Sequence, residues 1–165
     1  MAHPAEVMEA TADAPTGPGR ARHEDDLYTW VQEQVALLRA GRTDALDLDN
    51  IAEELSDVGN AQYSQLESAL RVLIIHMLKW DQQPEKRTPS WVYSIREQRR
   101  RYAKILRKNP GLKQHLETMR DDIYPTSRDW AADECHLPPD EFPPECPYDW
   151  EDLLDRPFDL DSVKT

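Results

Sequence analysis

Hydrophobic residues recur every three or four positions over most of this chain, which is the spacing of one face of an amphipathic α-helix. The first such stretch places Leu27, Trp30, Val31, Val35 and Leu38 on one face. Asp25 or Asp26 is placed to cap its start, and Gly41 supplies a left-handed residue to end it. The pattern predicts a first helix of about four turns between these limits.

The second stretch is the longest. Asp47, with Asn50 three residues on, is placed to cap it. Its apolar stripe consists of Ile51, Leu55, Val58, Gln62, Leu66, Ala69, Leu73 and Met77. The stripe keeps its phase across Gly59, which favours one continuous or bent helix of about 33 residues, on the order of 50 Å long. A break at Gly59 followed by a new helix is the alternative.

Two more main helices and a short one follow a polar, proline-containing stretch at 81–88. The third is predicted to start at Thr88–Pro89 and to end at Asn109, because the next residue is proline. The fourth starts at about Leu112, and a short helix lies near residues 148–154. The predicted fold class is all-α: an antiparallel bundle of about four main helices, with a long second helix and a short C-terminal helix.

Composition sets the domain limits within the 165 residues. Residues 1–24 are rich in Ala, Pro, Thr and Gly, so they are predicted to be a disordered N-terminal tail. Residues 25–155 are predicted to form a single helical domain, and 156–165 a C-terminal tail. No segment reaches the roughly 18 apolar residues of a membrane span, and no secretory signal is recognised. With two cysteines expected to be reduced thiols, these features predict a cytoplasmic protein without a membrane partner.

Charge is unevenly distributed. The net charge is −12, yet residues 96–108 hold seven basic residues and one acidic residue, whereas residues 133–161 hold eleven acidic residues and one basic residue. Arg96, Arg100, Lys104 and Arg107 share one helical face, which we call the basic face. Nucleic acid is one candidate partner for this face, although the net charge disfavours it. Pairing with the acidic segment, or with acidic residues of the second helix, is the favoured alternative.

Sequence motifs of catalysis are not found. No P-loop, GxGxxG, HExxH, GxSxG or helical Glu-x-x-His pair occurs, so we predict no catalytic residue and no cofactor. Cys135, His136 and Cys146, with or without His115, are candidate zinc ligands. Their spacing lacks the chelating pair typical of structural zinc sites, and no metal is expected.

A corner between the second and third helices is a candidate polar network or binding site. His76, Lys79 and Trp80 end one helix and Trp91 opens the next. Such a histidine is most often structural, but His76 could act as acid or base while Lys79 and Arg99 bind an anion. In the first turns of the second helix lie Glu53 and Glu54. They are expected to form a solvated or Arg-bonded face rather than a catalytic pair.

Several short motifs resemble a known family. They are LLRAG at 37–41, LDLDNIAEELSDVGN at 46–60, HMLKW at 76–80, SWVYSIREQRR at 90–100, NPGL at 109–112 and FPPECPY at 142–148. They occur in this order in the bacterial family known as domain of unknown function 29, and the chain is identified as a full-length member. The resemblance implies a helical domain with no assigned activity, substrate or cofactor.

The family pattern emphasises aromatic and charged residues. Those in the candidate corner match Glu53, Glu54, His76, Lys79, Trp80, Trp91 and Arg99. The resemblance therefore implies a buried polar network between the second and third helices, which is either a lock on the fold or a binding site. One departure is that Cys135–His136 stands where the family pattern has Thr-Gly.

The leading functional hypothesis is a non-enzymatic protein–protein interaction or regulatory module, with a homodimer along the second helix. Its basis is the long apolar stripe in a chain without a catalytic motif. An enzyme or anion-binding module at the corner of His76, Lys79, Trp91 and Arg99 is the first alternative. Nucleic-acid binding through the basic third helix is the second.

Overall fold

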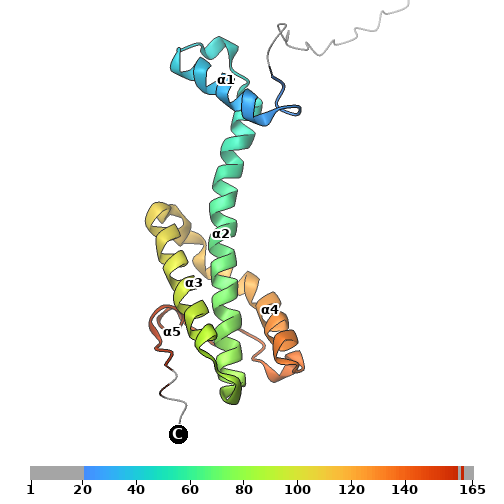
Figure 1. The fold of residues 1–165 in the computed structure, drawn as a ribbon, viewed down its shortest axis with the longest axis vertical. Helices are drawn as coiled ribbons and strands as arrows, with labels where there is room; N and C mark the ends of the chain where they lie inside the picture. The colour runs from blue at the N-terminus through green and yellow to red at the C-terminus, as the bar shows by residue number, and fades with distance from the viewer. Residues whose placement is uncertain (1–20, 160, 162–165) are drawn as a thin grey trace, which may run out of the picture. The chain divides into compact units, whose positions relative to one another are not determined.

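A computed structural model describes residues 21–159 and residue 161 of the chain (Figure 1). Its α-helices are α1 (Leu27–Arg39), α2 (Leu48–Gln82), α3 (Pro89–Lys108), α4 (Leu116–Cys135) and α5 (Trp150–Asp155). Short 3-10 turns are η1 (Thr43–Ala45), η2 (Pro84–Lys86), η3 (Pro110–His115) and η4 (Pro139–Glu141). The described residues contain no strand, and the predicted all-α bundle with a long second helix is confirmed.

The helix ends follow the local signals in the sequence. Asp26 caps α1 by accepting a hydrogen bond from the Thr29 N–H at 3.0 Å, and Gly41 follows α1 with a φ of 69°. Helix α2 is continuous across Gly59, as the phase of its stripe predicts. The fourth helix begins at Leu116 rather than near 112, because residues 110–115 form the tighter 3-10 turn.

The chain divides into two compact units, one ending at Leu55 and the other beginning at Ser56. The first unit contains α1, η1 and the start of α2, and the second contains the remaining elements. The single domain expected over 25–155 stays a prediction, and each unit is described by itself below. The predicted disorder of residues 1–24 falls on residues outside the described range, apart from 21–24.

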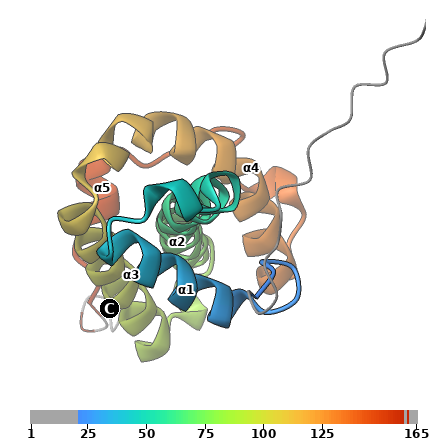
Figure 2. The ribbon, with the colours of Figure 1, turned by 90° about the horizontal axis from the view of Figure 1, so that it is seen from above.

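The second unit is an antiparallel bundle. Asn109, at the end of α3, donates from Nδ2 to the Oε1 of Gln62 on α2 at 3.2 Å, so α3 runs antiparallel to α2. Gln83, just after α2, donates from Nε2 to the backbone oxygen of Cys135 at 2.8 Å, so α4 ends where α2 ends. Figure 2 shows α3, α4 and α5 arranged around α2.

The hydrophobic core belongs to the second unit. Its fully buried members include Leu66, Leu70, Leu73, Ile74, Met77, Ile95, Met119 and Leu153. Burying one such side chain contributes about 1.5–3 kcal/mol. Phe158, in the segment expected to be a C-terminal tail, is also buried, so part of that segment packs on the bundle. In the described part of the first unit only Trp30 and Gln34 are buried.

Candidate functional site

Lys79 is the most enclosed charged residue of the predicted corner. Its side chain is 11% exposed, and its Nζ lies 2.5 Å from the Oε2 of Glu134 on α4 and 4.8 Å from the ring centroid of Trp91. The ammonium group therefore has both a carboxylate and an aromatic face as partners. Lys79 and Trp91 were predicted to lie together, whereas Glu134 was not among the predicted residues.

His76 lies about one turn before Lys79 on α2. Its Nδ1 donates a hydrogen bond to the backbone oxygen of Val72 at 2.8 Å. Burial, assisted by the positive charge of Lys79, lowers the pKa of His76 below its ordinary value and so favours the neutral imidazole. The proton on Nδ1 leaves Nε2 as the acceptor nitrogen.

Arg99 is directed at the C-terminal helix. Its Nε, Nη1 and Nη2 donate to the backbone oxygens of Leu153, Arg156 and Asp152 at 2.7, 2.8 and 2.9 Å. The last carbonyl groups of a helix have no hydrogen-bond donor within the helix. The Arg99 guanidinium supplies these donors at the end of α5. Burial lowers the pKa of Arg99. In this structure its donors hold α5 against α3.

Trp80 belongs to the same cluster as Arg99. The Arg87 Nε donates to the Trp80 backbone oxygen at 2.8 Å, and the Arg87 guanidinium lies 4.5 Å from the Trp80 ring. The Phe158 ring meets Trp80 edge-on at 5.5 Å and lies 5.2 Å from the Arg99 guanidinium. The predicted corner thus consists of two clusters, one around Lys79 and the other around Phe158.

Glu53 and Glu54 lie in the first unit and have different surroundings. Glu53 is exposed, whereas the Oε1 of Glu54 lies 2.7 Å from the Nε2 of His23. The His23 ring packs edge-on against Trp30 at 4.7 Å, and the Trp30 Nε1 donates to the Oδ2 of Asp47 at 3.2 Å. Asp47 also accepts from the backbone N–H of Asn50, and hydrogen bonds from Asn50 lower the pKa of this carboxyl. This network connects α1 to the start of α2.

The four members of the basic face, Arg96, Arg100, Lys104 and Arg107, are all exposed. Arg100 pairs with Glu97 on its own helix. Within the described part of the chain, none of the four forms an ion pair with the acidic segment 133–161. The basic face is thus available to a partner.

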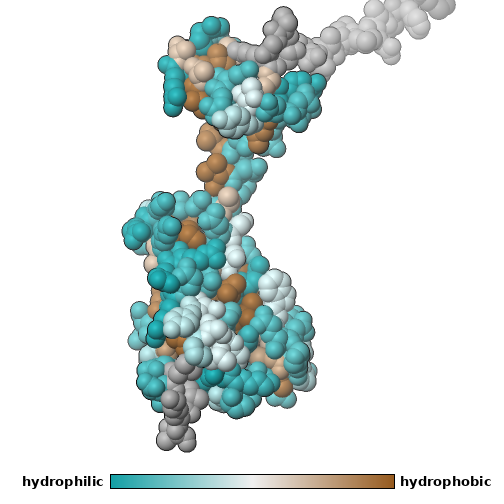
Figure 3. Space-filling view, in the orientation of Figure 1, coloured by the Kyte–Doolittle hydropathy of each residue, from teal (hydrophilic) through white to brown (hydrophobic). Residues whose placement is uncertain are grey.

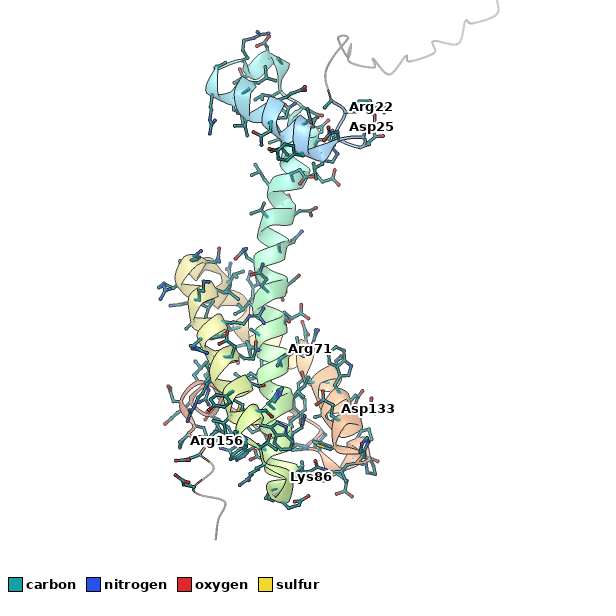
Figure 4. All side chains as sticks on the ribbon, in the orientation of Figure 1. Arg22, Asp25, Arg71, Lys86, Asp133 and Arg156 are labelled. Atoms are coloured by element: carbon teal, nitrogen blue, oxygen red, sulfur yellow. The ribbon has the colours of Figure 1, made fainter. Side chains whose placement is uncertain are left out.

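A cluster around Asp81 was not predicted. Arg156, which is labelled in Figure 4, donates to both carboxylate oxygens of Asp81. The Tyr148 hydroxyl donates to Oδ2 of the same carboxylate at 2.8 Å. Burial, reinforced by the negative charge of Asp81, raises the pKa of Tyr148. These residues line a pocket of about 290 Å³ together with Leu78 and Pro147. The only sequence signal was the concentration of prolines and aromatic residues after His136.

A second depression, of about 470 Å³, is lined by Arg120, Tyr124 and Cys146 among others. Burial raises the pKa of the Cys146 thiol, which disfavours the thiolate that nucleophilic chemistry requires. Cys135 and Cys146 are both free thiols. No group of three metal-ligating side chains is found among residues 21–159 and 161.

Large hydrophobic side chains remain exposed on α1, α2 and two other helices. Those in the first unit are Leu27, Tyr28, Leu38, Leu48 and Leu55. Those in the second unit are Val58, Tyr93 and Trp130. Leu55 and Val58, on adjacent turns of α2, are 67% and 63% exposed. Figure 3 shows brown, hydrophobic patches among the hydrophilic surface. The apolar stripe predicted along α2 is therefore buried only from Leu66 onwards.

The fold and the clusters define an all-α domain without a recognisable catalytic constellation among its described residues. The family described as "Domain of unknown function DUF29" matches residues 23–159, and the chain belongs to this family. No curated protein and no solved structure is significantly similar to the chain. In the described residues, no helix combines the length and apolar character required to cross a membrane.

Proposed function

We propose that this protein acts through protein–protein contact rather than catalysis, and that its immediate partner is a second copy of the same chain. The observation that carries the proposal is the first unit, in which residues 21–55 bury only Trp30 and Gln34 while exposing five large hydrophobic residues. Folded units of about 40 residues or fewer usually need a disulfide, a metal or a partner to be stable. The described part of this unit spans residues 21–55.

Helix α2 supplies the matching surface. Leu48, Ile51, Leu55, Val58 and Gln62 follow the alternating spacing of three and four residues that characterises a helix–helix seam. Leu48, Leu55 and Val58 are each more than 60% exposed. In a two-fold dimer these side chains would be buried in both copies. Each buried side chain contributes about 1.5–3 kcal/mol before the cost of association.

The alternative hypotheses gain less support. The Arg99 donors bind backbone oxygens and Lys79 is paired with Glu134, so the anion-binding corner has no free cation at these two positions. Nucleic-acid binding keeps the basic face as its surface but faces a net charge of −12. We also propose that the protein works in the bacterial cytoplasm, and the two free cysteines support a reducing compartment.

The test is the effect of a single charge placed on the α2 seam. Leu55→Asp and Val58→Asp should each shift the protein from dimer to monomer in size-exclusion chromatography with light scattering. Ser64→Asp, an exposed site on α2 outside the seam, is the matched control and should leave the dimer intact. A wild-type chain that elutes as a monomer would overturn the proposal. Equal effects of all three variants would also overturn it.

A further inference from the structure

The basic face of α3 takes no part in the proposed dimer, whose contacts lie on α2. We infer that this face, together with Tyr93, binds single-stranded nucleic acid. The inference goes beyond the proposed function and does not rest on it. A negative result for one surface would therefore leave the other unaffected.

Tyr93 extends the basic face towards the start of α3. With 3.6 residues per turn, Tyr93 and the four cations lie within a sector of about 80° and span about 21 Å along the helix. The buried residues of α3, among them Ile95 and Tyr102, lie on the opposite side of the helix. Figure 1 shows α3 alongside α2, at the edge of the bundle. The five side chains therefore form one continuous exposed surface that is not used by the core.

The cations of the basic face lack the partners that other cations of the second unit have. Carboxylates pair with Arg71, Lys79, Arg120, Arg128 and Arg156. Of the basic face, only Arg100 forms an ion pair with a described residue, and its partner Glu97 is the only acidic residue of α3. Like charges three or four residues apart on a helix repel one another, so a bound polyanion would relieve this repulsion.

The basic face has the chemistry to bind a phosphate backbone. Arg96, Arg100 and Arg107 carry guanidinium groups, which form paired hydrogen bonds with phosphate oxygens. Successive cations of the face are separated by about 4.5–6 Å along the helix axis, so one extended strand lying along α3 can meet several of them at once. Guanidinium groups also bind carboxylates, so the cations alone do not distinguish a nucleic acid from an acidic peptide.

Tyr93 favours the nucleic acid. Its side chain is 67% exposed, and it forms no hydrogen bond and no ring contact with another described residue. An exposed aromatic ring beside a row of cations offers a platform on which an unpaired base can stack. A chain of carboxylates has no ring to place there, and a duplex keeps its bases stacked on one another. A single strand therefore uses both features of this surface.

The net charge of −12 does not prevent such a contact. At physiological ionic strength, exposed charges more than about 8 Å apart are largely screened from one another. Residues 96–108 carry seven basic residues and one acidic residue, so the local field is positive. The net charge limits the affinity instead, and we expect a dissociation constant on the order of 1–100 μM at low salt.

The experiment measures binding of the full-length protein to labelled oligo(dT) of about 15 nucleotides by fluorescence anisotropy over a range of salt concentrations. Four phosphate contacts predict a slope of about −2.8 for the logarithm of the binding constant against that of the salt concentration. Arg100→Gln with Lys104→Gln should make this slope shallower by about 1.4 and weaken binding about tenfold. Arg42→Gln with Lys86→Gln removes the same charge at two exposed sites on other segments and should bind as the wild type does.

Substitutions of Tyr93 separate stacking from charge. Tyr93→Ala should weaken binding about fivefold without changing the salt slope, because no charge is removed. Tyr93→Phe keeps the ring and should bind as the wild type does. Tyr28→Ala, which removes an exposed ring from α1, is the control and should also leave binding unchanged. Circular dichroism checks that every variant keeps its helical fold.

Four results would overturn the inference. The first is a wild-type chain that binds neither oligo(dT) nor oligo(rU) at about 50 mM salt. The second is an equal effect of the two paired Gln variants. The third is competition by poly-glutamate as strong as that by unlabelled oligo(dT) of the same charge, which would assign the face to an acidic protein. The fourth is tighter binding of a duplex combined with no effect of Tyr93→Ala.

Discussion

The guanidinium group of Arg156 binds both carboxylate oxygens of Asp81, at 2.9 and 2.5 Å, and so ties the segment after α5 to the end of α2. Both side chains are about one third exposed, so solvent screens part of their attraction. The more buried partner is Tyr148, whose hydroxyl donates to the same carboxylate. The C-terminal segment is therefore a structural part of the bundle.

Replacing Tyr148 with Phe should lower the free energy of unfolding by about 1–2 kcal/mol at neutral pH, because the Asp81 carboxylate loses a hydrogen bond. The pKa of Tyr148 is raised above its ordinary value of 10.0, so the unfolded chain loses this proton first. Stability should fall as the pH rises above about 10, and less steeply in the variant. Urea unfolding across this range measures both effects. Tyr28→Phe, at an exposed site, should behave like the wild type.

Replacing Arg99 with Lys should lower the free energy of unfolding by about 2–3 kcal/mol, since one ammonium group cannot reproduce three divergent hydrogen bonds to the end of α5. Amide hydrogen exchange in α5 should accelerate selectively. Arg100→Lys is the control, because Arg100 is exposed and its one described ion pair is with Glu97. Unchanged protection of α5 would contradict this role for Arg99.

Two positions with left-handed backbone should respond in opposite directions. Gly41 has a φ of 69° and His136 a φ of 55°. Gly41→Ala should lower stability by about 1 kcal/mol, and His136→Gly should raise it by a similar amount. Thermal unfolding measures both. Glycine adopts this backbone region without the steric cost of a Cβ, which is why the two substitutions act in opposite directions.

His76 should make the fold sensitive to mild acid. Its pKa is lowered by burial from the ordinary value of 6.5, so the unfolded chain binds this proton first as the pH falls. The contribution of the neutral His76 to the free energy of unfolding is fully present above about pH 6.5. It is lost as the pH drops towards the pKa of His76 in the folded state. His76→Gln should flatten the pH dependence of the unfolding midpoint in this window. His136→Gln, at an exposed site, should leave the slope unchanged.

Sequence reasoning was most successful with features that depend on neighbouring residues. Asp47 was predicted to cap the second helix, and Asp26 was one of two candidates to cap the first, because capping needs only an acceptor three residues before a free N–H. The continuity of α2 across Gly59 followed from an unbroken apolar phase. These signals lie within a few residues of one another.

Partners that are distant in the sequence could not be predicted in this way. Asp81 and Tyr148 are 67 positions apart, and Lys79 and Glu134 are 55 apart. Periodicity places a residue on a helix face but does not say which face of another helix it meets. For this reason Arg99 was grouped with a possible anion, whereas the structure directs it to three backbone oxygens.

The most direct test of the account is the mass of the wild-type chain in solution. Sedimentation equilibrium at concentrations on the order of tens of micromolar should give twice the chain mass of 19.2 kDa if α2 pairs with a second copy. A mass that stays at 19.2 kDa over that range would contradict the proposed dimer.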